Sequence, residues 1–250
     1  MHDIIYGIHV IKEILDTCSN QLIHIFFQQN RQDLKFKNLI FLARQNNIPI
    51  KFATRKWLTK IIKYDKHQGV IAYVKSFNIL KENYLSKILE KKISYFFLII
   101  DNINDPRNLG SCIRSAYLAG AHAIIIKKDR SSKITPTVKK VSSGSVYLIP
   151  IIQVINLTRT IKLLKKYSIK VIGTSNTSQK NLYCENLNHP IALVVGSEEK
   201  GISNLIQKNC DYMLKIPVIN NKFPLNVSVA TGICLFEIIR QKYYNKLTNN

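Results

Sequence analysis

The sequence is short of acidic residues and has no long hydrophobic run. Among 250 residues, 15 are Asp or Glu and 37 are Lys or Arg, which gives a formal net charge of +22. The longest apolar candidate, Tyr95–Ile100, has the length of a strand, whereas a membrane span needs roughly 18–20 apolar residues. The N-terminus carries Asp3 early and lacks an apolar stretch of the signal-peptide kind. We therefore expect neither a membrane span nor a secretory signal.

Cysteine and histidine are too sparse and scattered to form a framework. The five cysteines are odd in number and contain no CxxC pair, and the six histidines contain no HxxxH pattern. Disulfide scaffolds and zinc sites both need such groupings, so neither is expected, and no metal site is predicted. Unpaired cysteines are typical of a reducing compartment, which favours the cytoplasm.

Glycine is also scarce, with nine residues in the chain. The sequence contains no Walker A motif, no GxGxxG after the first strand, and no GxSxG, HExxH or kinase signature. A Rossmann-type nucleotide site is therefore not supported. If the protein is an enzyme, something other than a glycine-rich phosphate cradle holds its ligand.

The basic charge is the most informative feature that the sequence does contain. A protein of this charge usually meets a polyanion; nucleic acid is the first candidate and an anionic membrane surface the second. The excess is mostly Lys, which attracts phosphate with little base-edge geometry. A solvated, lysine-rich surface without a partner is the alternative interpretation.

Periodicity divides the chain into two α/β parts. Residues 1–75 form a small unit, residues 76–92 are interpreted mainly as a linker with some helical pattern within 79–89, and residues 93–250 alternate strands with helices, which predicts a parallel sheet. Strands are expected at 23–27, 48–52 and 70–74, then at 95–101, 123–127, 146–149, 170–174, 191–196 and 213–216. Helices are expected at 8–15, 34–44 and 56–64, then at 108–119, 135–142, 157–166 and 226–242. The last helix is apolar all round, which indicates either a partner subunit or burial in its own core.

Three polar clusters stand at predicted strand ends or before the last helix. They are Asn104–Arg114, Gly196–Ile202 and Ile216–Ser228. Each alone reads as an ordinary capped loop or turn. Ligands of open α/β sheets bind at the carboxyl edge of the strands, so the three clusters together predict one site there.

Together the clusters resemble the three motifs of the SpoU/TrmH family of RNA ribose 2′-O-methyltransferases, in the SPOUT superfamily. The first is Asn108-Leu109-Gly110 with Arg114; the second is Gly196, Glu198, Gly201 and Ile202; the third is Ile216-Pro217 with Leu225-Asn226-Val227-Ser228-Val229-Ala230. The likeness extends to Tyr6-Gly7-Ile8-His9, His67-Gln68-Gly69-Val70 and Lys128-Asp129-Arg130-Ser131. These are similar to the bacterial group that methylates a guanosine ribose in the peptidyl-transferase region of 23S rRNA.

The resemblance implies a fold, a cofactor and partners. It implies a trefoil-knotted methyltransferase domain at residues 93–250 that binds S-adenosylmethionine, preceded by a ribosomal-protein-like RNA-binding domain at residues 1–75. It also implies a homodimer formed through the C-terminal helix. Gly196, Ile216, Leu225 and Gly201 match positions around the cofactor.

The resemblance further implies that Arg114 serves the reaction, in which a ribose 2′-OH attacks the sulfonium methyl group. A guanidinium has a pKa above about 12, so Arg114 acts either as a base assisted by a substrate phosphate or as a cation that stabilises the developing alkoxide. Asn108, Glu198 and Asn226 match the surrounding polar residues, which position loops or ribose.

The sequence departs from the family pattern in the third motif. Pro224 stands where relatives usually have Ser, and Asn220 where they often have Gly. Proline supplies neither a hydroxyl nor a backbone N–H.

Two alternatives to the rRNA enzyme are a tRNA ribose methyltransferase and a non-catalytic RNA-binding protein of ribosome assembly. Pro224 favours the non-catalytic protein. The presence of all four polar motif residues, Asn108, Arg114, Glu198 and Asn226, opposes it.

Overall fold

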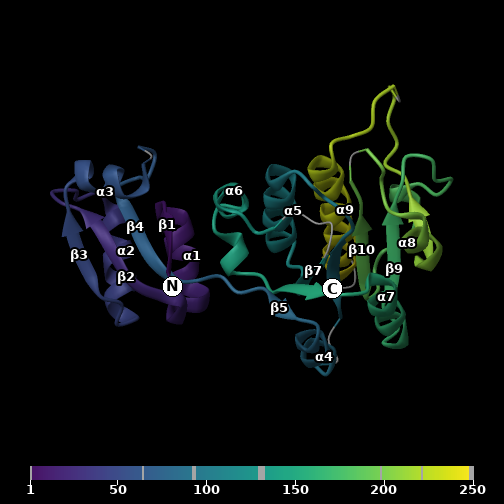
Figure 1. The fold of residues 1–250 in the computed structure, drawn as a ribbon, viewed down its shortest axis with the longest axis horizontal. Helices are drawn as coiled ribbons and strands as arrows, with labels where there is room; N and C mark the ends of the chain where they lie inside the picture. Colours follow the sequence, from purple (N-terminus) through teal and green to yellow (C-terminus); the bar gives the residue numbers. More distant parts are fainter. Residues whose placement is uncertain are drawn as a thin grey trace. The chain divides into compact units, whose positions relative to one another are not determined.

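The computed structural model describes residues 2–63, 65–91, 94–128, 133–197, 199–220 and 222–247 (Figure 1). The chain divides into two compact units, Met1–Asn78 and Ile79–Asn250. In the part of the chain that the structure describes, none of the helices is long and apolar enough to cross a membrane.

The first unit is a four-stranded sheet with helices. Its elements are β1 (His2–Tyr6), α1 (Ile8–Cys18), β2 (Leu22–Gln28), α2 (Leu34–Gln45), β3 (Ile50–Ala53), α3 (Arg55–Ile62) and β4 (Val70–Lys75). The strand order is β1-β4-β2-β3, with β2 and β3 parallel and the other pairs antiparallel. The helices and strands predicted from periodicity are present here; β1 was missed because its five residues show little alternation.

One face of this sheet carries the core of the unit. Ile25 and Phe27 of β2 and Val70, Ala72 and Val74 of β4 are buried on it. The ring of Phe36 on α2 meets that of Phe27 edge to face, with centroids 5.2 Å apart. Because side chains alternate across a strand, the neighbouring residues of β2 and β4 lie on the opposite face.

The second unit is a seven-stranded, wholly parallel sheet in the order β11-β9-β10-β6-β7-β8-β5. The strands are β5 (Leu80–Lys81), β6 (Phe96–Ile100), β7 (Ala123–Lys127), β8 (Ile151–Val154), β9 (Lys170–Thr174), β10 (Ile191–Val195) and β11 (Tyr212–Leu214). The helices are α4 (Asn83–Leu89), α5 (Pro106–Leu118), α6 (Pro136–Val141), α7 (Leu157–Lys166), α8 (Asn204–Asn209) and α9 (Val227–Leu247). This confirms the parallel α/β prediction.

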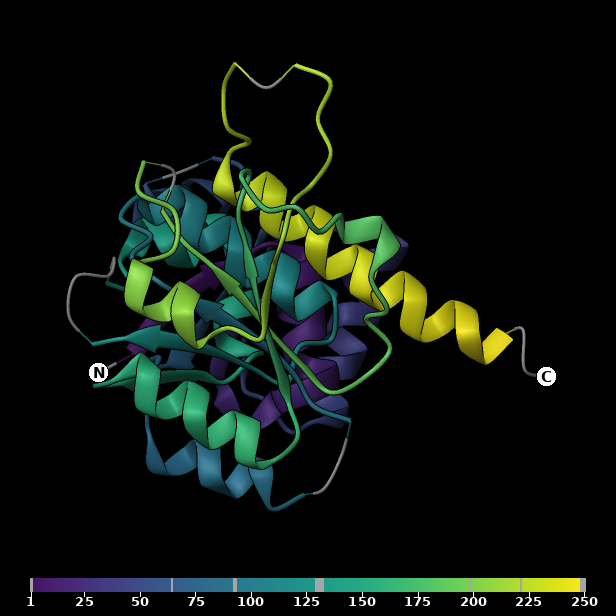
Figure 2. The ribbon, with the colours of Figure 1, turned by 90° about the vertical axis from the view of Figure 1, so that its right-hand side faces the viewer.

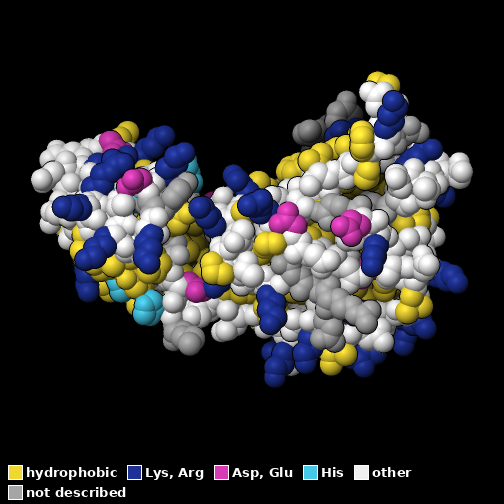
Figure 3. Space-filling view, turned by 45° about the horizontal axis from the view of Figure 1, so that its top comes forward, with side chains coloured by type: hydrophobic (Ala, Val, Ile, Leu, Met, Phe, Trp, Pro, Cys, Tyr) yellow, Lys and Arg dark blue, Asp and Glu magenta, His cyan; other side chains and the backbone are white. Residues whose placement is uncertain are grey.

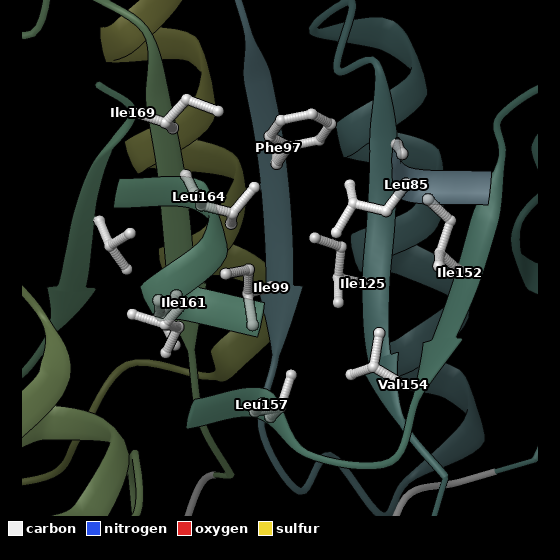
Figure 4. Packing of buried hydrophobic residues seen from close by; sticks show 14 of the residues in the cluster. Leu85, Phe97, Ile99, Ile125, Ile152, Val154, Leu157, Ile161, Leu164 and Ile169 are labelled. Carbon is white, nitrogen blue, oxygen red and sulfur yellow. The ribbon is translucent and has the colours of Figure 1, made fainter. Parts of the chain in front are cut away.

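The central strands are buried on both faces, as their continuous apolar runs predict. Every residue of β6 and β10 is buried. Helices α4, α7 and α8 bury Leu85, Ile161 and Ile206 in one cluster against alternate strand residues (Figure 4). Helix α5 packs against both α6 and α9, and α9 contacts β10.

Helix α5 approaches its neighbours closely at positions where side chains are small. A Cβ added at Gly110 would lie 2.8 Å from the Cβ of Val141 on α6. On the side toward α9, the buried Cys112 thiol lies 3.5 Å from the hydroxyl of Thr231. This packing holds the first turn of α5 beside the first turn of α9.

Two predictions of local structure were wrong. Most of the linker expected over residues 76–92 belongs to the second unit: β5 pairs with β8, and Leu85, Ile88 and Leu89 of α4 enter its core. The helical spacing of these three apolar residues was diluted by the Lys, Asn and Glu around them. The strand expected at 146–149 is instead a 3₁₀ turn, Ser145–Tyr147, and β8 begins after Pro150, which cannot donate to a ladder. The short helix α8 was not predicted.

Candidate functional site

A cavity of about 710 Å³ opens at the carboxyl ends of β9, β10 and β11. Small-molecule sites generally measure about 300–1,000 Å³, so the cavity has the volume of a ligand site. Its walls come from four segments and one helix, namely residues 174–177, 195–197 with 199–202, 214–216 with 218, 223–225 with 227 and 230, and Gln207 of α8. The second and third sequence clusters therefore meet in one cavity.

The turn after β10 brings backbone directly into this cavity. Ser197 and Gly201 form a two-way bridge: Gly201 N–H donates to the carbonyl of Ser197 at 2.9 Å, and Ser197 N–H donates back at 3.1 Å. Gly201 has φ +61°, and a Cβ at Gly196 would overlap the backbone of Gly201 and Ile202. Glycine is therefore required at 196 by close approach of backbone and favoured at 201 by conformation.

A buried carboxylate anchors the chain beyond this turn. Asp101, at the end of β6, is 1% exposed and accepts a hydrogen bond of 2.9 Å from the N–H of Ser203. Its own N–H donates to the carbonyl of Val195 at 2.8 Å, which extends the β6–β10 ladder by one residue. The sequence showed an Asp closing a strand but gave no signal that it positions the second cluster.

The first and third clusters are joined by a pair of amides. The Asn226 side-chain nitrogen donates to the side-chain oxygen of Asn108 at 3.1 Å, across 118 positions of sequence. The Asn226 oxygen accepts from the N–H of Ser228 at 2.9 Å and from its hydroxyl at 2.6 Å, so Asn226 also caps α9. Asn226 therefore both caps α9 and links the third cluster to the first.

Arg114 stands apart from the cavity walls. It lies in the middle of α5 with an exposed side chain, seven residues after Arg107, which is also exposed. Residues seven apart share a helix face, so the two guanidinium groups lie along one stripe of α5. Neither lines the cavity, and the stripe is available to an anion that approaches from outside it.

The predicted site residues thus fall into three groups. Gly196, Gly201, Ile216 and Leu225 line the cavity, and Asn108 and Asn226 meet beside the start of α9. Arg114 is exposed on α5, and Glu198 lies outside the described residues. The structure adds Thr174, Ser175, Asn176 and Thr177 to the cavity wall. Their signal was a run of four small polar residues directly after a buried strand.

The departing position Pro224 lies within the site. Pro224 and the preceding Phe223 both line the cavity, and Phe223 is 83% exposed. They belong to the segment between β11 and α9, which projects as a loop from the second unit (Figure 2). The proline that we interpret as replacing a family serine therefore stands in a wall that a ligand would touch.

The described residues offer no metal cluster, and burial keeps two of the cysteine thiols protonated. No group of three or more His, Cys, Asp or Glu side chains among them is arranged to hold a metal ion. Burial raises the pKa of the Cys210 thiol to about 12 and that of Cys234 to about 12, so both stay protonated near neutral pH. The cavity is lined by backbone groups, amides, hydroxyls and apolar side chains, together with the charged residues Glu199, Lys200 and Lys215.

Comparison with known proteins assigns both units. Residues 95–236 match the SpoU rRNA methylase family, and residues 4–80 match a domain described as RNA 2′-O ribose methyltransferase substrate binding. The chain belongs to the SpoU rRNA methylase family. The SpoU match contains all three sequence clusters, and the substrate-binding match covers the four-stranded unit.

Curated relatives match this chain over nearly its full length. A protein of Blochmanniella floridana named 23S rRNA (guanosine-2′-O-)-methyltransferase RlmB is 44% identical over 100% of this chain and 99% of its own. The protein of the same name from Escherichia coli K12 is 38% identical over 97% of this chain and 100% of its own. Both units and their order are therefore shared with these relatives.

Solved SpoU structures share the fold. The SpoU methyltransferase AviRb from Streptomyces viridochromogenes, crystallised with S-adenosylmethionine, aligns with TM-score 0.74 at 19% identity over 97% of this chain and 91% of that one. A TrmH/SpoU tRNA modifying enzyme of A. aeolicus aligns with TM-score 0.56 at 27% identity, over 67% of this chain and 85% of that one.

The replacement Gly196→Ala tests the close approach in the turn. The added methyl would push the backbone of Gly201 and Ile202 away from residue 196, so we expect the affinity for S-adenosylmethionine to fall about tenfold or more in titration calorimetry. Tyr167→Ala is the control, because Tyr167 is 43% exposed and does not line the cavity. Unchanged affinity in the Gly196 variant would contradict the assignment of this turn to the ligand.

Proposed function

We propose that this chain transfers a methyl group from S-adenosylmethionine to the 2′-hydroxyl of a guanosine ribose in 23S rRNA. The observation that carries the proposal is that the second and third motifs line one cavity at the carboxyl edge of the sheet, while Asn226 of the third motif is hydrogen-bonded to Asn108 of the first, 118 positions earlier in the sequence. The full-length likeness to proteins named for this reaction supports it. The target in the peptidyl-transferase region is part of the same proposal.

The cavity suits a cofactor that is held largely by backbone. Its volume and the neighbouring apolar side chains of Ile216 and Leu225 fit an adenosine with a polar tail, and the missing side chain of Gly196 lets the backbone of Gly201 and Ile202 close the turn beside it. When bound, the cofactor supplies an electrophilic methyl group on a sulfonium. The chain's part is to hold it with the turn at Gly196–Gly201 and to exclude water with the apolar wall.

Arg114 is proposed to act on the substrate rather than the cofactor. Its exposed guanidinium on α5 lies in the same stripe as Arg107, and such groups bind phosphate and stabilise oxyanions. Arg114 contacts the RNA in either of the two roles described above. It is a base assisted by a substrate phosphate in one, and a cation beside the developing alkoxide in the other. The Asn108–Asn226 pair fixes the starts of α5 and α9 relative to each other, and Glu198 stays a prediction in this scheme.

Transfer of labelled methyl groups to unmodified 23S rRNA and to tRNA tests the proposal. We expect a single 2′-O-methylguanosine in the large rRNA and none in tRNA, because the four-stranded unit matches a substrate-binding domain and the solved tRNA enzyme aligns over 67% of this chain. Transfer to tRNA alone would overturn the rRNA assignment. Cofactor binding without transfer to 23S rRNA, free or in a precursor particle, would favour the assembly protein that Pro224 suggests.

In the same assay, Arg114→Ala separates catalysis from cofactor binding. We expect methyl transfer to fall about 10²–10³-fold, the usual cost of removing one group that stabilises a transition-state charge. The affinity for S-adenosylmethionine should be unchanged, because Arg114 does not line the cavity. Arg159→Ala, on α7 at the other face of the sheet, is the control. If the Arg114 variant lost methyl transfer and affinity for S-adenosylmethionine to the same extent, the proposed role of Arg114 in the reaction would be rejected.

We also propose a homodimer through α9. The helix buries Cys234, Leu235 and Ile238 in its own unit, so burial in its own core accounts for part of its apolar surface. Val229, Phe236 and Tyr243 recur every seven residues and are 50%, 49% and 62% exposed. An exposed apolar stripe of this kind marks a protein interface.

The replacement Phe236→Asp tests this stripe. We expect a dimer in wild type and a monomer in the variant by light scattering after gel filtration, because a charge in an apolar interface is strongly unfavourable. Leu205→Asp, at a 62% exposed position on α8, should stay dimeric. A Phe236 variant that keeps the wild-type mass would show that the dimer forms elsewhere.

The cytoplasm is the proposed site of action. Its reducing conditions suit the free cysteines, and ribosomal RNA is found there.

A further inference from the structure

The four-stranded sheet of the first unit has a face that is only partly covered: Ile71 is fully buried on it, whereas most of its other side chains reach the surface. The strand register places His2, Ile4, His24, Phe26 and Tyr73 on the side opposite the core residues. These side chains are exposed or half-buried, whereas Ile25 and Phe27 on the other face are fully buried. Helix α3 borders this face through Trp57, which is 37% exposed.

Five rings form a continuous row across this face. His2 lies 4.9 Å from Tyr73 between ring centroids, and Tyr73 is stacked on His24 at 4.5 Å. Phe26 lies 5.0 Å from His24 and 4.7 Å from Trp57. We call these five residues the ring row. Rings from three strands and a helix are thus held in mutual contact at the surface rather than in a core.

The charge around the ring row is positive. The ammonium of Lys51 lies 5.6 Å from the centre of the Phe26 ring, and Lys75 pairs with His2 in the strand register. No Asp or Glu stands among the described strand positions of this face; the only strand acid, Asp3, points to the other side and accepts from the N–H of Phe77. Residues 1–78 as a whole carry twelve Lys and Arg against five Asp and Glu.

The histidine at the centre of the row behaves as an aromatic ring near neutral pH. Burial lowers the pKa of His24, and the neighbouring Lys51 and His2 lower it further. A neutral imidazole stacked on Tyr73 presents a flat π surface without a charge of its own. Figure 3 shows histidine atoms beside hydrophobic atoms on this unit, with Lys and Arg around them.

Flat rings flanked by lysines are the combination that unpaired nucleotides require. Bases stack on aromatic side chains, whereas the backbone phosphates follow nearby cations. A duplex hides its base faces inside the stack and cannot use such a surface. The surface has lysines and no carboxylate among its described strand positions, so it is suited to a partner that carries negative charge along its whole length, as RNA does, better than to a typical protein surface with charges of both signs.

We propose that the ring row binds an unpaired segment of the RNA substrate by base stacking, with Lys51 and Lys75 against its phosphates. The proposal rests on the proposed function for the identity of the RNA as substrate. Beyond the proposed function, it specifies which surface of the first unit binds the RNA, which residues form that surface, and that the bound RNA segment is single-stranded.

Trp57 provides a direct readout, because it is the one tryptophan in the chain. Titration of the full-length protein with a short single-stranded oligoadenylate should quench its fluorescence, whereas a duplex of the same length should not. Tyr73→Ala should weaken oligoadenylate binding about tenfold, and Tyr73→Phe should restore it, because only the ring is needed. Lys51→Gln should reduce the slope of log affinity against log salt by about one.

Phe41→Ala is the matched control. Phe41 is a 66% exposed aromatic on α2, which packs against the opposite face of the sheet, so its loss should change neither quenching nor affinity. The urea midpoint of each variant shows whether it folds, and the Lys51 variant tests the surface independently if Tyr73→Ala is unstable.

Quenching by duplex as strong as by oligoadenylate, or unchanged affinity in both the Tyr73→Ala and Lys51→Gln variants, would overturn the proposal. Methyl transfer is measured separately. Ring-row binding without transfer by the wild type would count against the proposed function alone, and transfer without dependence on Tyr73 or Lys51 would count against the ring row alone.

Discussion

The contact between the ends of β6 and β10 is the interaction on which the site depends. The two strands are parallel and buried on both faces, and the bond from Asp101 N–H to the carbonyl of Val195 continues their ladder to the sheet edge. The Asp101 carboxylate also accepts a hydrogen bond from the N–H of Ser203. The seven residues between Val195 and Ser203 must therefore turn back toward Asp101. That turn is possible because Gly196 has no side chain. An uncompensated buried carboxylate or an added methyl here would disturb the cavity before any ligand binds.

The second constraint is the packing of α5 on α9. Gly110 on α5 admits Val141 of α6, and the contact of Cys112 with Thr231 brings α5 and α9 together. The two helix starts therefore lie close enough for Asn226 to reach Asn108. The residues that we propose to serve the reaction are thus fixed by helix packing, whereas the positions that we propose for the cofactor are fixed by strand ends. The exposed residues Phe223 and Pro224 also line the cavity, and Pro224 is the position that we interpret as departing from the family pattern.

The fold followed from the sequence wherever a pattern repeated over a whole element. Continuous apolar runs predicted the buried strands β6 and β10, and helical spacing predicted α7 to the residue. Short elements did not repeat enough: α8 has six residues and β5 has two, and their type is decided by packing on the sheet. In the site, strand-end logic correctly brought Gly196, Ile216 and Leu225 together. It could not show that Asp101 anchors the turn or that Thr174–Thr177 complete the wall, because both depend on which strands become neighbours.

Amide hydrogen exchange of the full-length protein, with and without S-adenosylmethionine, tests most directly that the second and third motifs form one ligand site. The account predicts slowed exchange together in residues 174–177, 195–197 with 199–202, 214–218 and 223–230, since each of these four segments contributes residues to the same cavity. It predicts no change in the four-stranded sheet of the first unit, which contributes no residue to that cavity. Protection confined to one of the four segments, or found in the first unit instead, would contradict the account.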